Sequence, residues 1–123
     1  MQRSIAAARI GEPQKNADGA DIFEFCFAAN DPVFAGHFPS RPLLPGIFQL
    51  EMARAAVEII LNCPLTVREV SKAKFQRPIL PDETVRLELK LSETGETIQA
   101  RASFSVKGQS AGETILLLWR NQD

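Results

Sequence analysis

Hydrophobic residues recur at every second position in several segments of the chain, which is the pattern of strands buried on one face. In the clearest case Phe23, Phe25 and Phe27 lie on one side of an extended segment. A turn at Thr94-Gly95 would join two other alternating segments as a hairpin. The three segments with this pattern are residues 22–29, 84–92 and 97–107.

Three less regular segments also favour strands. They are residues 3–10, which are rich in alanine, residues 66–76, which look irregular and bulged, and residues 115–119, which are apolar on both faces as in a central strand. The polar segment from Glu12 to Asp21 contains Pro13, Asn16 and Gly19 and predicts a turn between the first two strands.

One helix is expected over Gly46–Asn62, where apolar residues cover most of the circumference. Its polar residues gather in one narrow stripe, formed by Glu51, Arg54, Glu58 and Asn62. A helix this apolar is mostly enclosed by protein rather than lying on a surface. Pro64 stops it.

The predicted order is therefore two strands, one enclosed helix and four strands. One antiparallel sheet wrapped around a central helix satisfies both the apolar helix and the single-faced strands. This α+β arrangement is the hotdog fold. Because such a sheet leaves its edges and one helix end poorly covered, we expect a dimer.

Composition narrows the class of protein. A chain of 123 residues is long enough for one core, so we expect a single domain over residues 1–123. Hydrophobic residues are 45%, charged residues 24% and the net charge is −1, which gives no support for nucleic-acid binding. Cys26 and Cys63 lie far apart and are expected as reduced thiols of a cytoplasmic protein. We expect neither an export leader nor a membrane span.

The candidate chemistry lies in the segment from His37 to Glu51, HFPSRPLLPGIFQLE, which holds the only histidine of the chain. Phe34 and Phe38 would give that histidine apolar walls, and Pro39 stiffens the backbone beside it. Apolar surroundings favour the neutral imidazole at pH 7, which can act as a base. A structural role for a lone histidine remains the alternative.

Two further residues of this segment have both a functional and a structural interpretation. Glu51 either pairs with Arg54 three residues later on a solvated face, or, partly removed from water, holds a proton to donate. Gly46 follows Pro45 at the helix start, where backbone N–H groups without acceptors can bind a carbonyl oxygen that gains negative charge. The alternative is that Gly46 is needed only for its backbone freedom, and the two interpretations are compatible.

The same residues resemble the signature of the 3-hydroxyacyl-[acyl-carrier-protein] dehydratases, the FabZ/FabA-type hotdog enzymes. The similarity comprises the His-Phe-Pro triplet, the Pro-Gly at the helix start and an acidic residue fourteen positions after the histidine. Residues 30–36 and 73–82 are similar to the segments that precede and follow that signature in the family. The resemblance covers roughly residues 22–119.

The resemblance implies that His37 removes the C2 proton, that Glu51 protonates the departing 3-hydroxyl and that the Gly46 N–H holds the thioester carbonyl. It implies acid–base chemistry, for which we expect no cofactor and no metal. It also implies that His37 and Glu51 of one site come from opposite subunits of a homodimer. The side chains expected to line the acyl site are Phe34, Phe38, Pro45, Ile47 and Phe48.

The resemblance further implies an acidic acyl carrier protein as the partner that delivers the substrate on a phosphopantetheine arm. Four basic residues fall in segments that could rim the mouth of a tunnel: Arg41, Lys72, Lys74 and Arg77. They are expected either to dock the carrier or to form a scattered solvated surface.

Several features depart from the family pattern. The chain is expected to start directly at a strand, without the helix and His-Arg-Tyr-Pro-Phe-like stretch that usually precede it. Tyrosine is absent, and Asp82-Glu83 stands where the family tends to have Gly-Asp. These departures favour a dehydratase of a specialised pathway, such as one that makes aryl-polyene-type acyl chains, over housekeeping fatty-acid synthesis.

Two other classes stay open. A non-catalytic hotdog subunit could bind the carrier or complete a heterodimer, but such a subunit would need neither His37 nor Glu51. A hotdog thioesterase would need an acid to activate water, but not the His-Phe-Pro loop.

Overall fold

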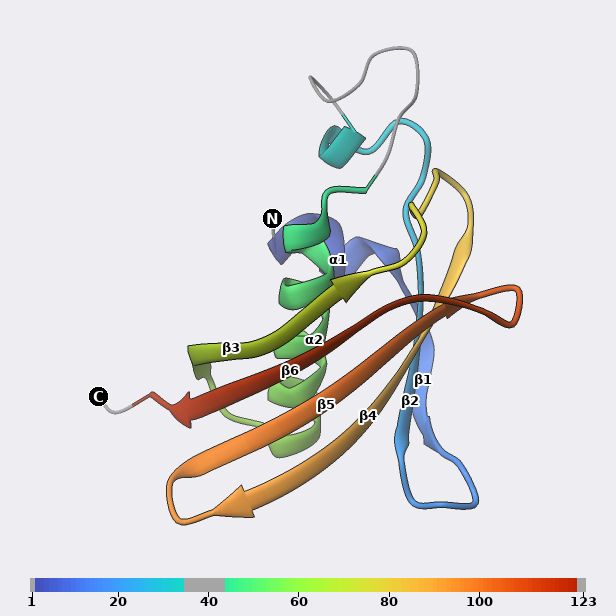
Figure 1. Cartoon of the computed structure of the whole chain (residues 1–123). Helices are drawn as coiled ribbons and strands as arrows, with labels where there is room; N and C mark the ends of the chain where they lie inside the picture. Colours follow the sequence, from blue (N-terminus) through green and yellow to red (C-terminus); the bar gives the residue numbers. More distant parts are fainter. Residues whose placement is uncertain (1, 35–43, 122–123) are drawn as a thin grey trace.

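A six-stranded antiparallel sheet curves around the helix α2 in the computed structural model of the chain, which describes residues 2–34 and 44–121 (Figure 1). The strand order is β1-β2-β4-β5-β6-β3. The elements in chain order are α1 (Gln2–Ala8), β1 (Arg9–Lys15), β2 (Asp21–Cys26), the 3₁₀ helix η1 (Pro32–Phe34), α2 (Gly46–Leu61), β3 (Leu65–Phe75), β4 (Thr84–Thr94), β5 (Thr97–Val106) and β6 (Gln109–Arg120). The predicted hotdog fold is confirmed.

The alternating segments bury the faces that their patterns predict. Phe23 and Phe25 on β2, and Phe27 just after it, are at most 2% exposed. On β4 and β5 the inward side chains are Val85, Leu87, Leu89, Ile98, Ala100, Ala102, Phe104 and Val106. The turn between these two strands is formed by Gly95 and Glu96, one residue later than predicted, and Gly95 has a φ of 60°. A positive φ suits glycine, which lacks a Cβ.

The prediction of a strand over residues 3–10 is wrong, because Gln2–Ala8 forms the helix α1. Alanine has the highest helix propensity, and this segment has only one β-branched residue to favour a strand. Ile5 and Ala8 lie on one face of α1 and are 3% and 4% exposed. The strand β1 instead begins at Arg9 and occupies part of the segment predicted as a turn. The expectation that no helix precedes the first strand is therefore also wrong.

The four strands predicted after the helix are present as β3, β4, β5 and β6. β6 lies between β5 and β3, as expected of a segment that is apolar on both faces. β3 forms one edge of the sheet, and its register against β6 shifts twice, which confirms the expected irregularity. β3 is therefore a long edge strand whose pairing with β6 is interrupted by bulges.

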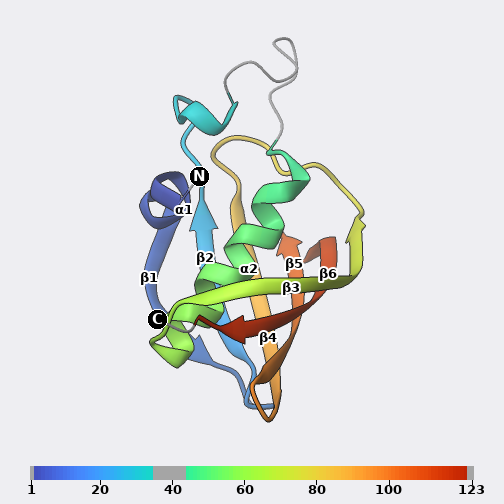
Figure 2. The ribbon, with the colours of Figure 1, turned by 90° about the vertical axis from the view of Figure 1, so that its left-hand side faces the viewer.

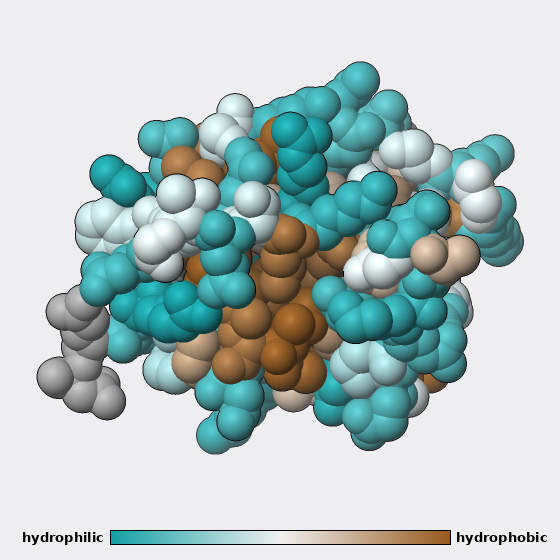
Figure 3. Space-filling model, turned by 90° about the horizontal axis from the view of Figure 1, so that it is seen from below, coloured by the Kyte–Doolittle hydropathy of each residue, from teal (hydrophilic) through white to brown (hydrophobic). Residues whose placement is uncertain are grey.

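The helix α2 is enclosed only on the side that faces the sheet. Figure 2 shows α2 crossing in front of the sheet, with α1 beside it. Met52, Ala53 and Ala56 are fully buried, whereas Ile47 and Ile59 are 51% and 44% exposed. At the end of the molecule where α2 finishes, apolar side chains gather in the middle of a polar rim (Figure 3).

No helix within the described residues combines the length and the apolarity needed to cross a membrane.

Candidate functional site

The start of α2 leaves backbone N–H groups without side-chain partners. Pro45 precedes the helix, and no side chain caps it. Leu44, which is 5% exposed, donates its N–H to the Ile79 carbonyl at 2.9 Å. The first N–H groups of a helix have no acceptor inside it, and their dipoles attract negative charge. The chain therefore enters α2 at a fixed point, with donors available there.

Gly46 also packs closely against the ring of Phe75. A Cβ on Gly46 would lie 2.8 Å from the Cε2 atom of Phe75, at the end of β3. Such a contact forces one of the two groups to move, so the aromatic ring can lie this close only to a glycine. Backbone donation and close packing are both consistent with glycine at this position.

Residues 31–34, which precede the segment that contains His37, are anchored to the core and to α1. Val33 and Phe34 are 6% and 8% exposed. Asp31 Oδ1 accepts hydrogen bonds from the Val33 N–H and from the Ser4 hydroxyl of α1, each at 2.8 Å. Three of the predicted site residues, His37, Phe38 and Arg41, lie outside the described residues.

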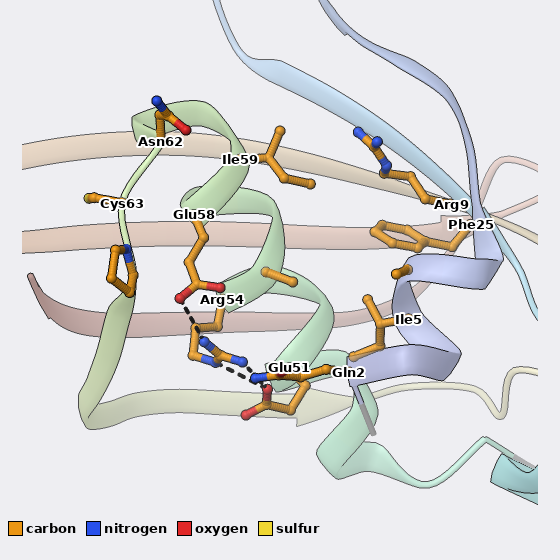
Figure 4. Close-up of a pocket in the computed structure, with 13 residues that line it drawn as sticks. Gln2, Ile5, Arg9, Phe25, Glu51, Arg54, Glu58, Ile59, Asn62 and Cys63 are labelled. Atoms are coloured by element: carbon orange, nitrogen blue, oxygen red, sulfur yellow. Dashed lines mark hydrogen bonds and ion pairs between the residues drawn. The ribbon is translucent and has the colours of Figure 1, made fainter. Parts of the chain in front are cut away.

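Glu51 lies on the wall of a groove of about 580 Å³ between α1 and α2 (Figure 4). From α2, Glu51, Ala55, Glu58 and Ile59 line it, which is one helix face. The opposite wall comes from α1 and the first two strands, through Gln2, Ile5, Ala6, Arg9 and Phe25. The groove therefore combines apolar walls with a row of charged groups.

The pairing of Glu51 with Arg54, one of the two alternatives for this residue, is present. Arg54 Nε and Nη2 both donate to Glu51 Oε2, at 3.0 and 2.7 Å. Arg54 Nη1 lies 2.9 Å from Glu58 Oε2 on the next turn, as Figure 4 shows. The hydrogen bond to Glu51 raises the pKa of Arg54, burial opposes the rise, and the charges of both carboxylates support it. Arg54 is thus a permanent cation between two carboxylates.

The predicted acyl-site residues occupy different environments. Ile47 is exposed, and Pro45 and Phe48 are half-buried. The Phe48 ring packs edge-to-face against Phe27, with 6.4 Å between the ring centroids. Phe34 belongs to the core. These four side chains surround the start of α2 or lie beneath it, and none of them lines the groove beside Glu51. Among the four, only Ile47 presents a largely open apolar surface.

Two of the predicted carrier-docking residues are engaged in ion pairs. Lys72 Nζ lies 2.7 Å from Glu113, and Arg77 Nη2 lies 2.9 Å from Glu83. Lys74 is exposed and has no ion-pair partner within residues 2–34 and 44–121. Of the three described candidates for docking the carrier, Lys74 is therefore the one that is not engaged in an ion pair.

The structure adds groups that the sequence did not indicate. The α1 wall of the groove was missed because that segment was predicted as a strand. Gln49 is 2% exposed, and its Oε1 has no hydrogen-bond partner among the described residues. A Cβ on Gly112 of β6 would lie 2.5 Å from this oxygen. The only sequence signal for this buried oxygen was the presence of a polar residue, Gln49, on the side of an apolar helix that faces the sheet.

No three His, Cys, Asp or Glu side chains in the described parts of the chain come together as metal ligands.

Comparisons with known proteins identify the family. The family model of ApeI-like proteins, described as ApeI dehydratase, matches residues 13–114. The chain belongs to the ApeI-like dehydratase family. This confirms the prediction of a hotdog dehydratase related to the FabZ-type enzymes.

Proteins related in sequence to this ApeI-like chain include 3-hydroxyacyl-[acyl-carrier-protein] dehydratases. The 3-hydroxyacyl-[acyl-carrier-protein] dehydratase FabZ of Herpetosiphon aurantiacus is 34% identical over 72% of this chain and 68% of its own length. The FabZ of Chloroflexus aggregans is 36% identical over 78% of this chain and 72% of its own length. In the bifunctional LpxC/FabZ of Chlorobaculum tepidum, the 32% identical region covers 72% of this chain and only 21% of that protein. The predicted dehydratase activity is supported by these homologues.

Solved structures agree on the fold. The chain superposes on the dehydratase heterocomplex ApeI:P from Xenorhabdus doucetiae with a TM-score of 0.75 and 24% identity, covering 91% of this chain and 96% of the other. A hypothetical thioesterase from Streptococcus pneumoniae gives a TM-score of 0.69 at 8% identity, covering 91% and 86%. At these identities the similarity concerns the fold alone.

Proposed function

We propose that the chain, as a single hotdog domain over residues 1–123, dehydrates (3R)-3-hydroxyacyl thioesters carried on an acyl carrier protein to trans-2-enoyl thioesters. The observation that carries this proposal is the position of Glu51. It lies on an apolar-walled groove, and only ~7.5 Å along the helix axis from the uncapped start of α2. Glu51 thus lies between the groove, which extends from it towards the end of α2, and the N–H donors at the helix start.

In the proposed reaction, the imidazole of His37 removes a proton from C2 of the substrate. Electrons of that C–H bond form the C2=C3 double bond as the C3–O bond breaks, and the proton on Glu51 passes to the departing hydroxyl, which leaves as water. The Gly46 N–H stabilises the negative charge that develops on the thioester oxygen. Phe34, Phe38, Pro45, Ile47 and Phe48 would surround the acyl group.

The proposed enzyme is a homodimer in which each site uses two chains. β3 is an edge strand, and such strands present unpaired backbone groups to a partner. Phe75 at its end is 49% exposed and contacts Gly46 of α2, while Ile47 is 51% exposed. Apolar surface beside the proposed site supports coverage by a second copy. The two cysteines, neither in a disulfide, support a reducing compartment such as the cytoplasm.

The test uses carrier-bound 3-hydroxyacyl thioesters of several chain lengths, analysed by mass spectrometry for the loss of water. General acid–base groups contribute about 10²–10⁴-fold each, so His37→Ala and Glu51→Gln should each lose that much activity while remaining folded. Glu93→Gln, which removes an exposed carboxylate paired with Arg120, is the matched control and should keep its activity.

Full activity in either site variant would contradict the assigned roles. Release of a free carrier thiol, in place of the enoyl thioester, would show that the protein hydrolyses the substrate. That result would contradict dehydration and identify the protein as a thioesterase. The absence of both products on every carrier-bound substrate would favour a non-catalytic subunit.

A further inference from the structure

Arg54 has two acidic neighbours, and its bonds to them differ. It donates twice to one oxygen of Glu51, Oε2, and Glu51 Oε1 accepts no hydrogen bond from the described residues. One oxygen of the carboxylate is therefore fixed, and the other is available to hold and transfer a proton. Side chains of Arg54 and Glu51 are 12% and 24% exposed, so water screens this pair only in part.

The second carboxylate anchors the cluster to the sheet. Glu58 Oε2 accepts a hydrogen bond from the Leu65 N–H at 2.8 Å, and Arg54 Nη1 lies 3.3 Å from the Leu65 carbonyl oxygen. Leu65 is 2% exposed and begins β3. The guanidinium is therefore held by a buried backbone as well as by its own helix, which fixes the direction from which it approaches Glu51.

The negative charge of Glu58 also affects how strongly Arg54 acts on Glu51. One cation between two carboxylates leaves the cluster of Glu51, Arg54 and Glu58 with a net charge of −1. An arginine that faced Glu51 alone would favour the ionised carboxylate, which cannot donate a proton. Glu58 offsets that effect, because it shares the same guanidinium.

We propose that Arg54 and Glu58 are positioning residues for Glu51: Arg54 fixes one carboxylate oxygen, and Glu58 balances the charge of Arg54 so that Glu51 can carry the proton used in dehydration. The proposal rests on the proposed function. The other titratable groups along the groove are Arg9, at the start of β1, and Cys63, beyond the end of α2. On β3, Arg68 stacks over Trp119 and Lys72 pairs with Glu113.

The first measurement is independent of activity. Carboxyl carbons of glutamate are labelled with ¹³C, and the Glu51 signal is assigned from its loss in Glu51→Gln. In Glu58→Gln, the amide oxygen can still accept from Leu65 while the negative charge is gone. The pH midpoint of the Glu51 signal should then fall by about one unit. It should rise in Arg54→Met, and Glu93→Gln, the matched control, should leave it unchanged.

The second measurement is the pH profile of kcat and KM for a carrier-bound 3-hydroxyacyl thioester. A fall of one unit reduces the protonated fraction about tenfold, so Glu58→Gln should lower kcat at pH 7 by up to tenfold with little change in KM. Arg54→Met should also lower kcat, because the Glu51 carboxylate is no longer held in position. This loss is expected even though the midpoint of the Glu51 signal rises in that variant. Arg54→Lys should restore the midpoint but only part of kcat, because an ammonium cannot reproduce the forked contacts.

The outcomes separate this inference from the function on which it rests. An unchanged Glu51 midpoint in a folded Glu58→Gln variant overturns the charge balance, whatever the enzyme does. A wild-type kcat in Arg54→Met overturns the positioning role. If the wild-type protein dehydrates no carrier-bound substrate, the function fails, while the NMR titration still decides whether Glu58 controls the proton on Glu51.

Discussion

At the scale of single residues, the surroundings of a charged side chain decide whether it can meet a partner. Lys72 and Arg77 are each held by a carboxylate within 3 Å, whereas Lys74, on the same edge strand as Lys72, is exposed. A cation already paired inside the protein must give up that pair before it can bind an acidic carrier. Among Lys72, Lys74 and Arg77, the proposed docking contribution is therefore concentrated on Lys74.

We expect Lys74→Glu to raise KM for carrier-bound substrate about fivefold and to leave kcat unchanged. An exposed ion pair contributes up to about 1 kcal/mol, which corresponds to roughly this factor. The effect should shrink at high salt, where exposed charges are screened. Steady-state kinetics at two ionic strengths measure it, with Lys90→Glu on β4 as the control. An unchanged KM would place the docking face elsewhere or indicate a CoA substrate.

At the scale of elements, the turn that leads into β4 is held by one carboxylate. Glu83 Oε1 accepts from the Leu80 N–H at 2.8 Å, and Oε2 accepts from Arg77 at 2.9 Å. Burial of the group works against its ionisation, but these two hydrogen bonds outweigh burial and lower the pKa of Glu83. The turn is thereby fixed beside Ile79, whose carbonyl accepts the Leu44 N–H before α2.

Glu83→Gln should lower the free energy of unfolding by about 1 kcal/mol at pH 7. Since folding lowers the pKa of this group, its contribution is complete above the unfolded value of about 4.3 and is lost as pH falls through the folded value. The difference between wild type and variant should therefore shrink as pH falls below about 4.3 and disappear once the pH is below the lowered pKa of the folded state. Urea unfolding at several pH values measures this.

Glu96→Gln provides the control for that series. Glu96 lies in the exposed turn between β4 and β5 and has no ion-pair partner in the described part of the chain. Its substitution should change stability by less than about 0.5 kcal/mol at every pH. A Glu83→Gln variant as stable as wild type at pH 7 would mean that the turn does not depend on this carboxylate.

At the scale of the whole molecule, we expect the proposed site to be divided between two chains. The groove and Glu51 lie between α1 and α2, and the apolar side chains Ile47 and Phe75 lie exposed at the start of α2. A twofold axis at the β3 edge would bring the α2 surface of one chain towards the histidine segment of the other. Each site would then need residues from both copies.

Mixing inactive His37→Ala with inactive Glu51→Gln should restore activity when subunits exchange. Half of the dimers in a random mixture are heterodimers, and one of their two sites is intact, so about a quarter of wild-type activity is expected. Native mass spectrometry of the mixture confirms the exchange. If exchange occurs without recovery, both residues of each site belong to one chain.

The sequence by itself determined the elements whose signals are local. The alternation of Phe23, Phe25 and Phe27, and the apolar circumference after Gly46, place strands and helix correctly, because side-chain period follows directly from backbone geometry. The helix α1 was missed because a short, alanine-rich segment has little periodicity, and its packing against α2 and β2 decides its conformation.

Only the tertiary structure decided which distant residues meet. The sheet places β3 beside β6, an arrangement that no local pattern encodes, and this brings Phe75 onto Gly46 and the Leu65 backbone onto Arg54 and Glu58. The spacing of Glu51, Arg54 and Glu58 put them on one helix face, but it left open whether that face was solvated. The packing of α2 against the sheet and α1 decides how far this face is exposed to water, because burial depends on neighbours that are far away in the chain.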